Sequence, residues 1–130
     1  MRHTLKFAGL LLAVAALVGC NTMPIQNVSN APVMSATGKN LSNQEVRDAI
    51  VRAGGALGWK MKDERANMLV GTLQLRDHVA VIEIPYTTSA YTIRYRTSVN
   101  LDEKDGMIHK NYNGWILNLT RGINAQLSAS

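Results

Sequence analysis

The stretch AYTIRYRTSVNL, residues 90–101, alternates apolar or aromatic residues with polar ones over its whole length. Because neighbouring side chains of a β-strand point to opposite faces, this pattern predicts a strand with one buried and one exposed face. Two arginines, Arg94 and Arg96, lie on the predicted exposed face. The predicted buried face carries Tyr91, Ile93, Tyr95, Thr97, Val99 and Leu101.

Shorter segments on both sides of this stretch show the same period of two and are bounded by turn-forming residues. They are therefore predicted to be strands as well, and the short turns between them favour antiparallel pairing. The predicted strands are residues 59–63, 68–76, 79–86 and 107–112.

The apolar pattern also predicts a register for the strand that precedes residue 90. With Ile82 opposite Ile93, the apolar residues of both strands lie on one face, as a half-buried antiparallel sheet requires. The opposite face is then polar, and Glu83 and Arg94 are diagonal neighbours on it.

Two segments have helical rather than strand periodicity. Residues 43–57 carry apolar residues at helical spacing, and Ser42 with Glu45 forms a capping-box sequence at the start. Residues 114–128 form a second amphipathic segment, which Asn113 is predicted to cap. Both segments are predicted to be helices that need an apolar partner surface.

Two amphipathic helices and a one-sided sheet must share their apolar faces to exclude water. The sequence therefore predicts an α+β fold with the element order α-β-β-β-β-β-α, in which both helices pack on one face of an antiparallel sheet. This small domain is predicted to span residues 41–130, a length that folds without disulfides.

The first 19 residues have the composition of a secretory signal. Two basic residues, Arg2 and Lys6, precede an apolar run from Phe7 to Gly19. This run is too short to span a bilayer, which requires about 20 apolar residues, but it matches the core of a signal peptide. Residues 1–19 are therefore interpreted as a cleaved targeting signal outside the fold.

The segment Leu17-Val18-Gly19-Cys20 resembles the lipobox of bacterial lipoproteins. The resemblance implies cleavage before Cys20, a lipid on its sulfur and an acylated new amino terminus, so that the protein is held at a membrane. Two or three acyl chains make release slow, whereas one chain holds only marginally. In lipoproteins of enteric bacteria, Asp directly after the cysteine is associated with retention in the inner membrane, whereas this chain has Asn21 there. The resemblance therefore favours the periplasmic side of the outer membrane; the inner membrane and the cell surface are the alternatives.

Residues 20–40 contain several asparagines and two prolines, and Lys39 is their only charged residue. They show no sustained period and are predicted to be a flexible, lipid-anchored tether with a reach of roughly 25 Å. The alternative is that part of this segment, such as Val33 and Met34, pairs along an edge of the sheet.

Charge and cysteine content exclude several classes of function. Lys plus Arg is 14 and Asp plus Glu is 9, a net charge of +5, but the basic residues form no dense cluster, so nucleic-acid binding is not expected. The single cysteine, Cys20, is assigned to the anchor and rules out an internal disulfide. We predict no metal site and no cofactor.

The polar face that carries Arg94 and Arg96 is the best candidate contact surface, with Lys60, Lys62 or Lys110 as possible flanking residues. Arginine pairs well with phosphate and carboxylate groups. The alternative is a solvated face on which Glu83 pairs with Arg94. Tyr86, in the hydroxyl-rich loop of residues 85–91, is a further candidate contact residue, the alternative being a plain hairpin loop.

Three functional hypotheses follow. The first is a non-enzymatic envelope lipoprotein that binds another envelope component, as an accessory or assembly factor. The second is direct binding of an anionic glycan or lipid through Arg94 and Arg96. The third is a hydrolase that uses His109 with Tyr112 or a serine, although no nucleophile motif is present in the sequence.

Overall fold

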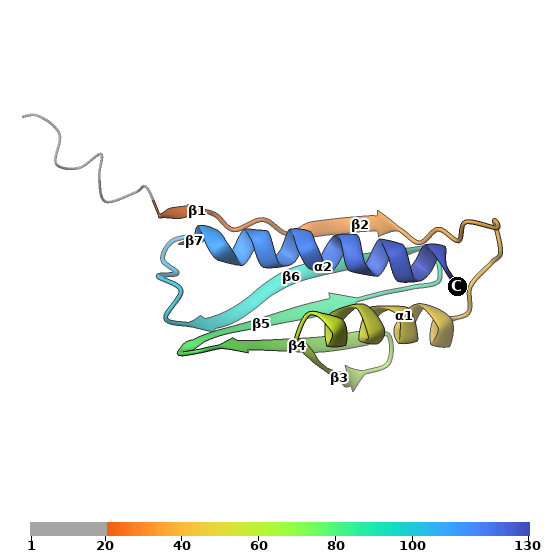
Figure 1. Ribbon diagram of the computed structural model, residues 1–130, viewed down its shortest axis with the longest axis horizontal. Coiled ribbons are helices and arrows are strands. Elements are labelled where there is room, and N and C mark those ends of the chain that lie inside the picture. Colours follow the sequence, from red (N-terminus) through yellow and green to blue (C-terminus); the bar gives the residue numbers. More distant parts are fainter. Residues whose placement is uncertain (1–20) are drawn as a thin grey trace, which may run out of the picture.

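The computed structural model describes residues 21–130 and has the predicted α+β fold (Figure 1). The predictions for residues 1–20, including Cys20, lie outside the described residues. Along the chain the elements are β1 (Thr22–Pro24), β2 (Val28–Pro32), α1 (Asn43–Ala56), β3 (Lys60–Arg65), β4 (Met68–Leu75), β5 (His78–Pro85), β6 (Ala90–Val99), β7 (Met107–His109) and α2 (Lys110–Ser128).

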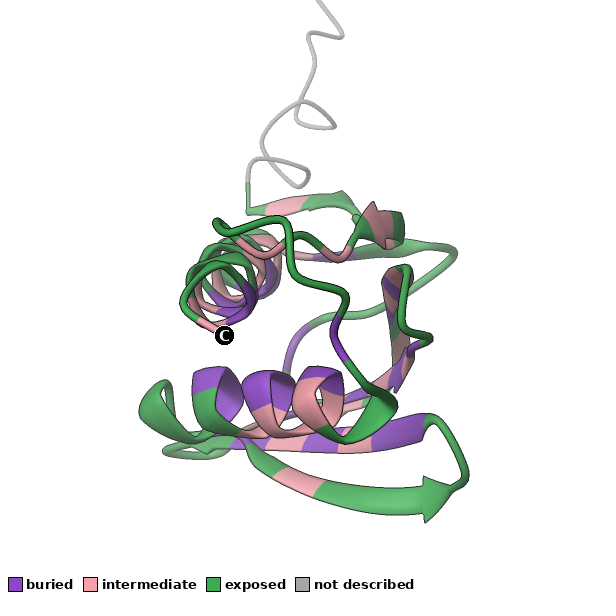
Figure 2. Ribbon diagram, turned by 90° about the vertical axis from the view of Figure 1, so that its right-hand side faces the viewer, coloured by how far each residue is buried: buried purple, intermediate pink, exposed green. Residues whose placement is uncertain are grey.

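The main sheet has five antiparallel strands in the order β2-β6-β5-β4-β3, and β1 pairs with β7 in a small second sheet. The two helices pack on each other and on the main sheet. Figure 2 shows that buried segments of both helices and of the sheet turn toward the space between them. The other side of the main sheet is left uncovered by the helices.

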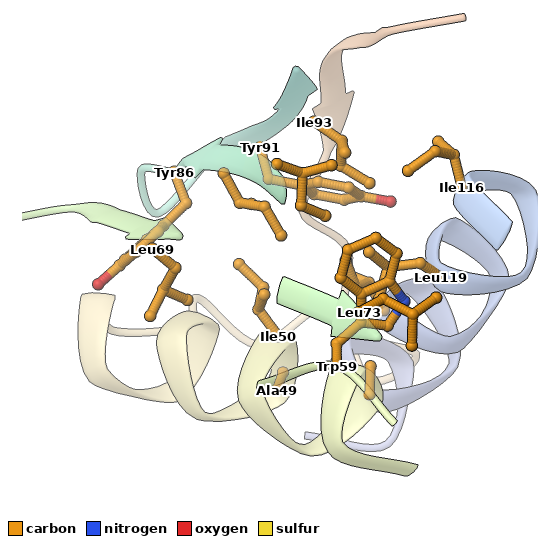
Figure 3. Close-up of a cluster of buried hydrophobic side chains, with 14 of the residues drawn as sticks. Ala49, Ile50, Trp59, Leu69, Leu73, Tyr86, Tyr91, Ile93, Ile116 and Leu119 are labelled. Atoms are coloured by element: carbon orange, nitrogen blue, oxygen red, sulfur yellow. The ribbon is translucent and has the colours of Figure 1, made fainter. Parts of the chain in front are cut away.

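The core fills the space between helices and sheet (Figure 3). Apolar residues from α1, α2 and every strand of the main sheet contribute to it or pack against it, Met61 being the contribution of β3, in agreement with the predicted periodicities. The predicted capping box is also confirmed: the Ser42 hydroxyl accepts from the Glu45 amide at 3.1 Å, and the Glu45 carboxylate accepts from the Ser42 amide at 3.2 Å. These bonds satisfy two donors that the first turn leaves free.

The prediction of a flexible tether is wrong for the segment that contains β1 and β2. β2 pairs with β6 along the edge of the main sheet, as the alternative for this segment proposed, although at Val28–Pro32. Asparagine side chains help to hold the segment: Asn27 Oδ1 accepts from the Tyr95 amide at 3.0 Å. Asn113 Nδ2 donates to the Pro24 carbonyl at 2.9 Å. The polar composition of this segment led to the prediction of flexibility, but the segment makes hydrogen bonds to residues far away in the sequence.

The start of the second helix also differs from the prediction. Helix α2 begins at Lys110, and His109 is its N-cap, with Nδ1 accepting from the Asn111 amide at 3.2 Å. Asn113 therefore lies inside the helix, where its side chain bonds the β1 segment instead of capping. The predicted strand 107–112 is reduced to β7, which pairs with β1 and not with the main sheet.

The strand register differs from the predicted one, although most residues keep their predicted face. Ile82 lies opposite Tyr95 instead of Ile93, a shift of two residues that leaves the buried set unchanged. Between Tyr95 and Thr97 the register shifts again, so that Arg96 has no partner on β5. This bulge reverses the alternation, and Val99, predicted to be buried, is 54% exposed.

Candidate functional site

The surface of the main sheet that faces away from the helices is the candidate contact surface, and we call it the outer face. Its position follows from the alternation along the strands, since Leu69, Ile82 and Ile84 are buried on the helix side. Strands β3 to β6 all contribute to the outer face. Its polar residues include Lys60, Lys62, Glu64, Thr72, Glu83, Arg94 and Arg96.

The outer face contains a hollow of about 440 Å³ next to β3, which we call the basic hollow. Val70 and Thr72 of β4 contribute to its lining. Its other lining residues are charged: Lys60, Lys62, Asp63, Glu64 and Arg96. A hollow lined by one apolar side chain and several charged ones is suited to a ligand that carries charge of its own.

The two lysines are the cations of the basic hollow that remain available. Lys60 and Lys62 make no ion pair within residues 21–130. The Asp63 carboxylate is bound by Arg47 of α1, with Nη2 to Oδ2 at 2.7 Å and Nε to Oδ1 at 2.9 Å. The sequence pointed to the lysines only as possible flanking residues, whereas the structure places them in the hollow itself.

Arg96 forms one wall of the basic hollow and is paired with a glutamate. Its Nη1 donates to Glu64 Oε2 at 2.8 Å and its Nη2 to Glu64 Oε1 at 3.0 Å, a bidentate arrangement. These hydrogen bonds hold the pKa of the Glu64 carboxyl below its usual range and raise the pKa of Arg96. The positive charge of Arg96 is therefore balanced locally.

Arg94 is paired as well, with Glu83 on the neighbouring strand. The two residues lie directly opposite each other in the β5–β6 register, and Arg94 Nη2 donates to Glu83 Oε2 at 3.1 Å. This is the pairing that the alternative interpretation of the face proposed, although the residues are opposite and not diagonal. The structure thus brings Arg94 and Arg96 to the outer face, where each has a carboxylate partner.

Tyr86 is not an exposed contact residue, which corrects the prediction. Its side chain is only 6% exposed and belongs to the hydrophobic core, and burial raises the pKa of its hydroxyl. Figure 3 shows the ring directed toward α1. The residue was predicted to lie in a loop, but its backbone continues the sheet through a bridge to Tyr91 and so fixes the ring against the core.

A second hollow, of about 460 Å³, lies at the end of the β5–β6 hairpin, and we call it the hydroxyl hollow. Thr87 and Ser89 contribute hydroxyls that bond each other at 3.2 Å, and Arg94 lies at its margin. The remaining lining residues are Asn30, Pro85, Tyr86, Ala90 and Thr92. Hydroxyl and amide groups of this kind can exchange hydrogen bonds with a polar ligand.

The two histidines of the described residues, His78 and His109, have structural hydrogen bonds. His78 Nδ1 lies 2.7 Å from the Asn100 carbonyl oxygen, and His109 caps α2. The Tyr112 side chain, a proposed partner of His109, is completely buried, and its hydroxyl bonds no group within residues 21–130. In this described part of the chain, no group of three His, Cys, Asp or Glu residues could hold a metal ion.

None of the helices in residues 21–130 combines the length and the apolar character needed to cross a membrane. The comparisons with known proteins add no further assignment: no family model, curated protein or solved structure matches this chain.

Proposed function

We propose that this chain is a lipid-anchored, non-enzymatic protein of the bacterial cell envelope whose basic hollow binds an acidic segment of another envelope protein. Lipid attachment is assigned to Cys20 on the resemblance of residues 17–20 to a lipobox. On this proposal the protein is an accessory or assembly factor held at a membrane, on the periplasmic side of the outer membrane.

The observation that carries the binding proposal is the pair of lysines in the basic hollow. Lys60 and Lys62 are exposed on β3, lie over an uncovered face of the sheet and make no ion pair within the described residues. Charge complementarity therefore favours an acidic ligand. Val70 beside them offers apolar contact to the ligand backbone or to the methylene groups of its side chains.

A second candidate function is binding of an anionic glycan, and the hydroxyl hollow favours it. Thr87, Ser89 and Thr92 offer hydroxyls next to the Arg94 guanidinium, which suits a sugar that carries a carboxylate. Arg94 is already paired with Glu83, however, whereas the lysines of the basic hollow make no ion pair within the described part of the chain. The acidic protein segment is therefore the first candidate.

The anchor is tested by mass spectrometry of the protein isolated from membranes. We expect a mature chain that begins at Cys20 and carries acyl groups on that residue. A chain that retains residues 1–19, or an unmodified Cys20, would contradict the anchor.

The binding role is tested with two polymeric probes, poly-L-glutamate and polygalacturonate, against the purified protein at low and high salt. We expect poly-L-glutamate to bind in a salt-sensitive way. Replacing both lysines, Lys60→Gln with Lys62→Gln, should weaken its binding roughly tenfold, since each exposed charge contributes up to about 1 kcal/mol. Replacing Lys104 and Lys110, exposed near the β7 end, provides a control with the same loss of charge.

The two probes separate the candidate functions. Binding of polygalacturonate alone, weakened by Arg94→Gln, would favour the glycan. Equal losses from the Lys60/Lys62 variant and from the control variant would show that the hollow is not the site. Absence of binding to either probe would refute the binding role.

A further inference from the structure

Arg96 and Glu64 occupy comparable positions in their strands, because each is the extra residue of a β-bulge. Asp63 pairs with Leu69 and Arg65 with Met68, which leaves Glu64 without a partner on β4. Likewise Tyr95 pairs with Ile82 and Thr97 with Val81, which leaves Arg96 without a partner on β5. A bulge redirects a side chain, and here both side chains are directed onto the outer face.

We infer that Glu64 occupies the guanidinium of Arg96 in the free protein as a stand-in for a carboxylate of the acidic ligand, which displaces it on binding. This inference rests on the proposed function, because it assumes that the basic hollow takes an acidic ligand. It assigns Arg96 as the residue that fixes one ligand carboxylate, while Lys60 and Lys62 attract the rest of the acidic segment.

The geometry of the pair favours a carboxylate as the displacing group. The Glu64 carboxylate already engages two guanidinium nitrogens, at 2.8 and 3.0 Å. A ligand carboxylate can reproduce both bonds, so that the exchange conserves the number of hydrogen bonds. The ammonium group of a lysine is a point charge and lacks this planar pair of donors. Arg96 can therefore bind a carboxylate in a fixed orientation, which Lys60 and Lys62 cannot.

The position of Glu64 makes displacement feasible. Strand β3 is at the edge of the sheet and is paired on one side only, and residues 62–67 are all exposed. The side chains of Glu64 and Arg96 are 38% and 41% exposed, and ion pairs of this kind contribute little to stability. The neighbouring Arg65 also acts electrostatically on Glu64, so that the released carboxylate remains next to a cation.

Arg96, in contrast, belongs to the interior of the sheet. Strand β6 lies between β2 and β5, and the Tyr95 amide is bonded to Asn27. Arg96 therefore extends from a backbone whose two neighbouring residues, Tyr95 and Thr97, are paired with β5, while its present partner extends from an edge strand. This asymmetry indicates that Glu64 moves and Arg96 stays.

The other arginine on the face provides a comparison within the molecule. Glu83 lies directly opposite Arg94 on adjacent strands, where cross-strand neighbours of opposite charge pair as a rule. No such register places Glu64 beside Arg96, because two strands lie between them in the sheet. Glu83 is therefore a structural partner, and its removal should not open the basic hollow.

The test measures the affinity of poly-L-glutamate for variants that each remove one negative charge. Glu64→Gln frees Arg96, Glu83→Gln frees Arg94, and Asp63→Asn removes a carboxylate that lines the same hollow but is bound to Arg47. We expect Glu64→Gln to bind about fivefold more tightly than the wild type, and the other two variants to change by less than about twofold. Equal gains in affinity in all three variants would show that the gain follows from the lost negative charge alone, and would overturn the inference.

A second comparison isolates the guanidinium. Arg96→Lys in the Glu64→Gln background keeps the charge but removes the planar pair of donors. We expect most of the gain in affinity to disappear, whereas an unchanged gain would overturn the inference. If the wild type binds through Lys60 and Lys62 and Glu64→Gln brings no gain, the inference fails and the proposed function stands. If neither the wild type nor Glu64→Gln binds the probe, both are wrong.

Discussion

The guanidinium of Arg96 and the carboxylate of Glu64 form a bidentate ion pair across the outer surface of two intervening strands, β4 and β5. Neither residue has a partner in the ladder of its own strand, since both are bulge residues. The pair therefore depends on side-chain reach and on the curvature of the sheet. Such a contact is exposed and can be exchanged without disturbing the core.

Replacement of Glu64 by Gln should accordingly leave the free energy of unfolding close to that of the wild type. Exposed ion pairs are weakened by water and salt and contribute little. Urea unfolding at pH 7, with Glu83→Gln as the comparison, measures the effect. A marked loss of stability for Glu64→Gln alone would show that this pair supports the fold, contrary to its proposed role.

The ion pair between Asp63 and Arg47 predicts a pH dependence of stability. It links β3 to α1, and the hydrogen bonds from Arg47 hold the pKa of Asp63 below its usual range. A carboxyl with a lowered folded-state pKa stabilises the protein above its unfolded pKa, roughly 3.9, and this contribution is lost as the pH falls through the folded-state value. Asp63→Asn should thus lower the Tm at pH 7.

This Tm difference should shrink as the pH falls below about 4, where the Asp63 carboxyl of the unfolded chain takes up a proton, and should vanish once the folded-state carboxyl is protonated as well. Thermal unfolding followed by circular dichroism from pH 7 to pH 2.5 measures it. A Tm difference that stays constant over this range would mean that the asparagine variant is destabilised by a cause other than the lost charge.

Gly54 and Gly71 leave room for Met61 between α1 and the sheet, whereas Gly55 faces open space, so alanine substitutions at these glycines should have opposite effects. A Cβ at Gly54 would collide with the Met61 side chain, and one at Gly71 would lie 2.9 Å from Met61 Sδ and 3.1 Å from Ile82 Cγ1. At Gly55, in contrast, no atom of the described residues outside the adjacent backbone of its own helix lies within 4 Å of the added carbon. Gly55→Ala should therefore stabilise the protein by about 1 kcal/mol through helix propensity.

For Gly71→Ala we expect a loss of roughly 1–3 kcal/mol from overpacking. Gly54→Ala should be clearly less stable than Gly55→Ala, because the same gain in helix propensity is offset by displacement of Met61. Chemical denaturation of the three variants tests the packing. Equal stabilisation by Gly54→Ala and Gly55→Ala would show that Met61 moves aside without cost.

The buried tyrosines predict a second pair of opposite effects. The Tyr91 hydroxyl donates to Asn124 Oδ1 at 2.7 Å, whereas the fully buried Tyr112 hydroxyl bonds no group within residues 21–130. Tyr91→Phe should cost about 1 kcal/mol, the usual contribution of such a bond. Tyr112→Phe should raise the free energy of unfolding by roughly 1 kcal/mol, because it removes a polar group from an apolar site.

The measurement for both tyrosine variants is urea unfolding under identical conditions. Tyr95 packs edge-on against Tyr112, with ring centroids 5.7 Å apart, and Phe preserves that contact. A destabilised Tyr112→Phe would indicate that the hydroxyl has a partner outside the described residues or in solvent.

The fold class could be predicted because local patterns and burial agree over most of the chain. Ser42 and Glu45 mark the start of α1 through a local motif, and the alternation of residues 90–95 identifies the buried face of β6. The register could not be fixed in the same way. A shift of two residues keeps every side chain on its face, so that Ile82 satisfies the pattern opposite either Ile93 or Tyr95.

The features that the sequence did not reveal depend on contacts between distant residues. Nothing local marks Arg96 as a bulge, so Val99 was assigned to the wrong face. The sequence placed Asn27 in a flexible segment and predicted Asn113 to cap a helix. Their hydrogen-bond partners in the structure lie 68 and 89 residues away along the chain. Similarly, only the assembled sheet shows that both arginines are paired while Lys60 and Lys62 make no ion pair within residues 21–130.

The bond between the Lys110 amide and the Asn21 carbonyl, 2.9 Å long, fixes the chain at the residue directly after Cys20. If Cys20 is acylated, no slack remains between the bilayer and the folded body, because one trans peptide unit spans only about 3.8 Å. The domain would then stay close to the membrane surface, one residue from its lipid anchor. Since β1 and β3 lie on opposite sides of the molecule (Figure 1), the hollow beside β3 would lie on the side of the domain far from the anchor, within reach of partners in the aqueous phase.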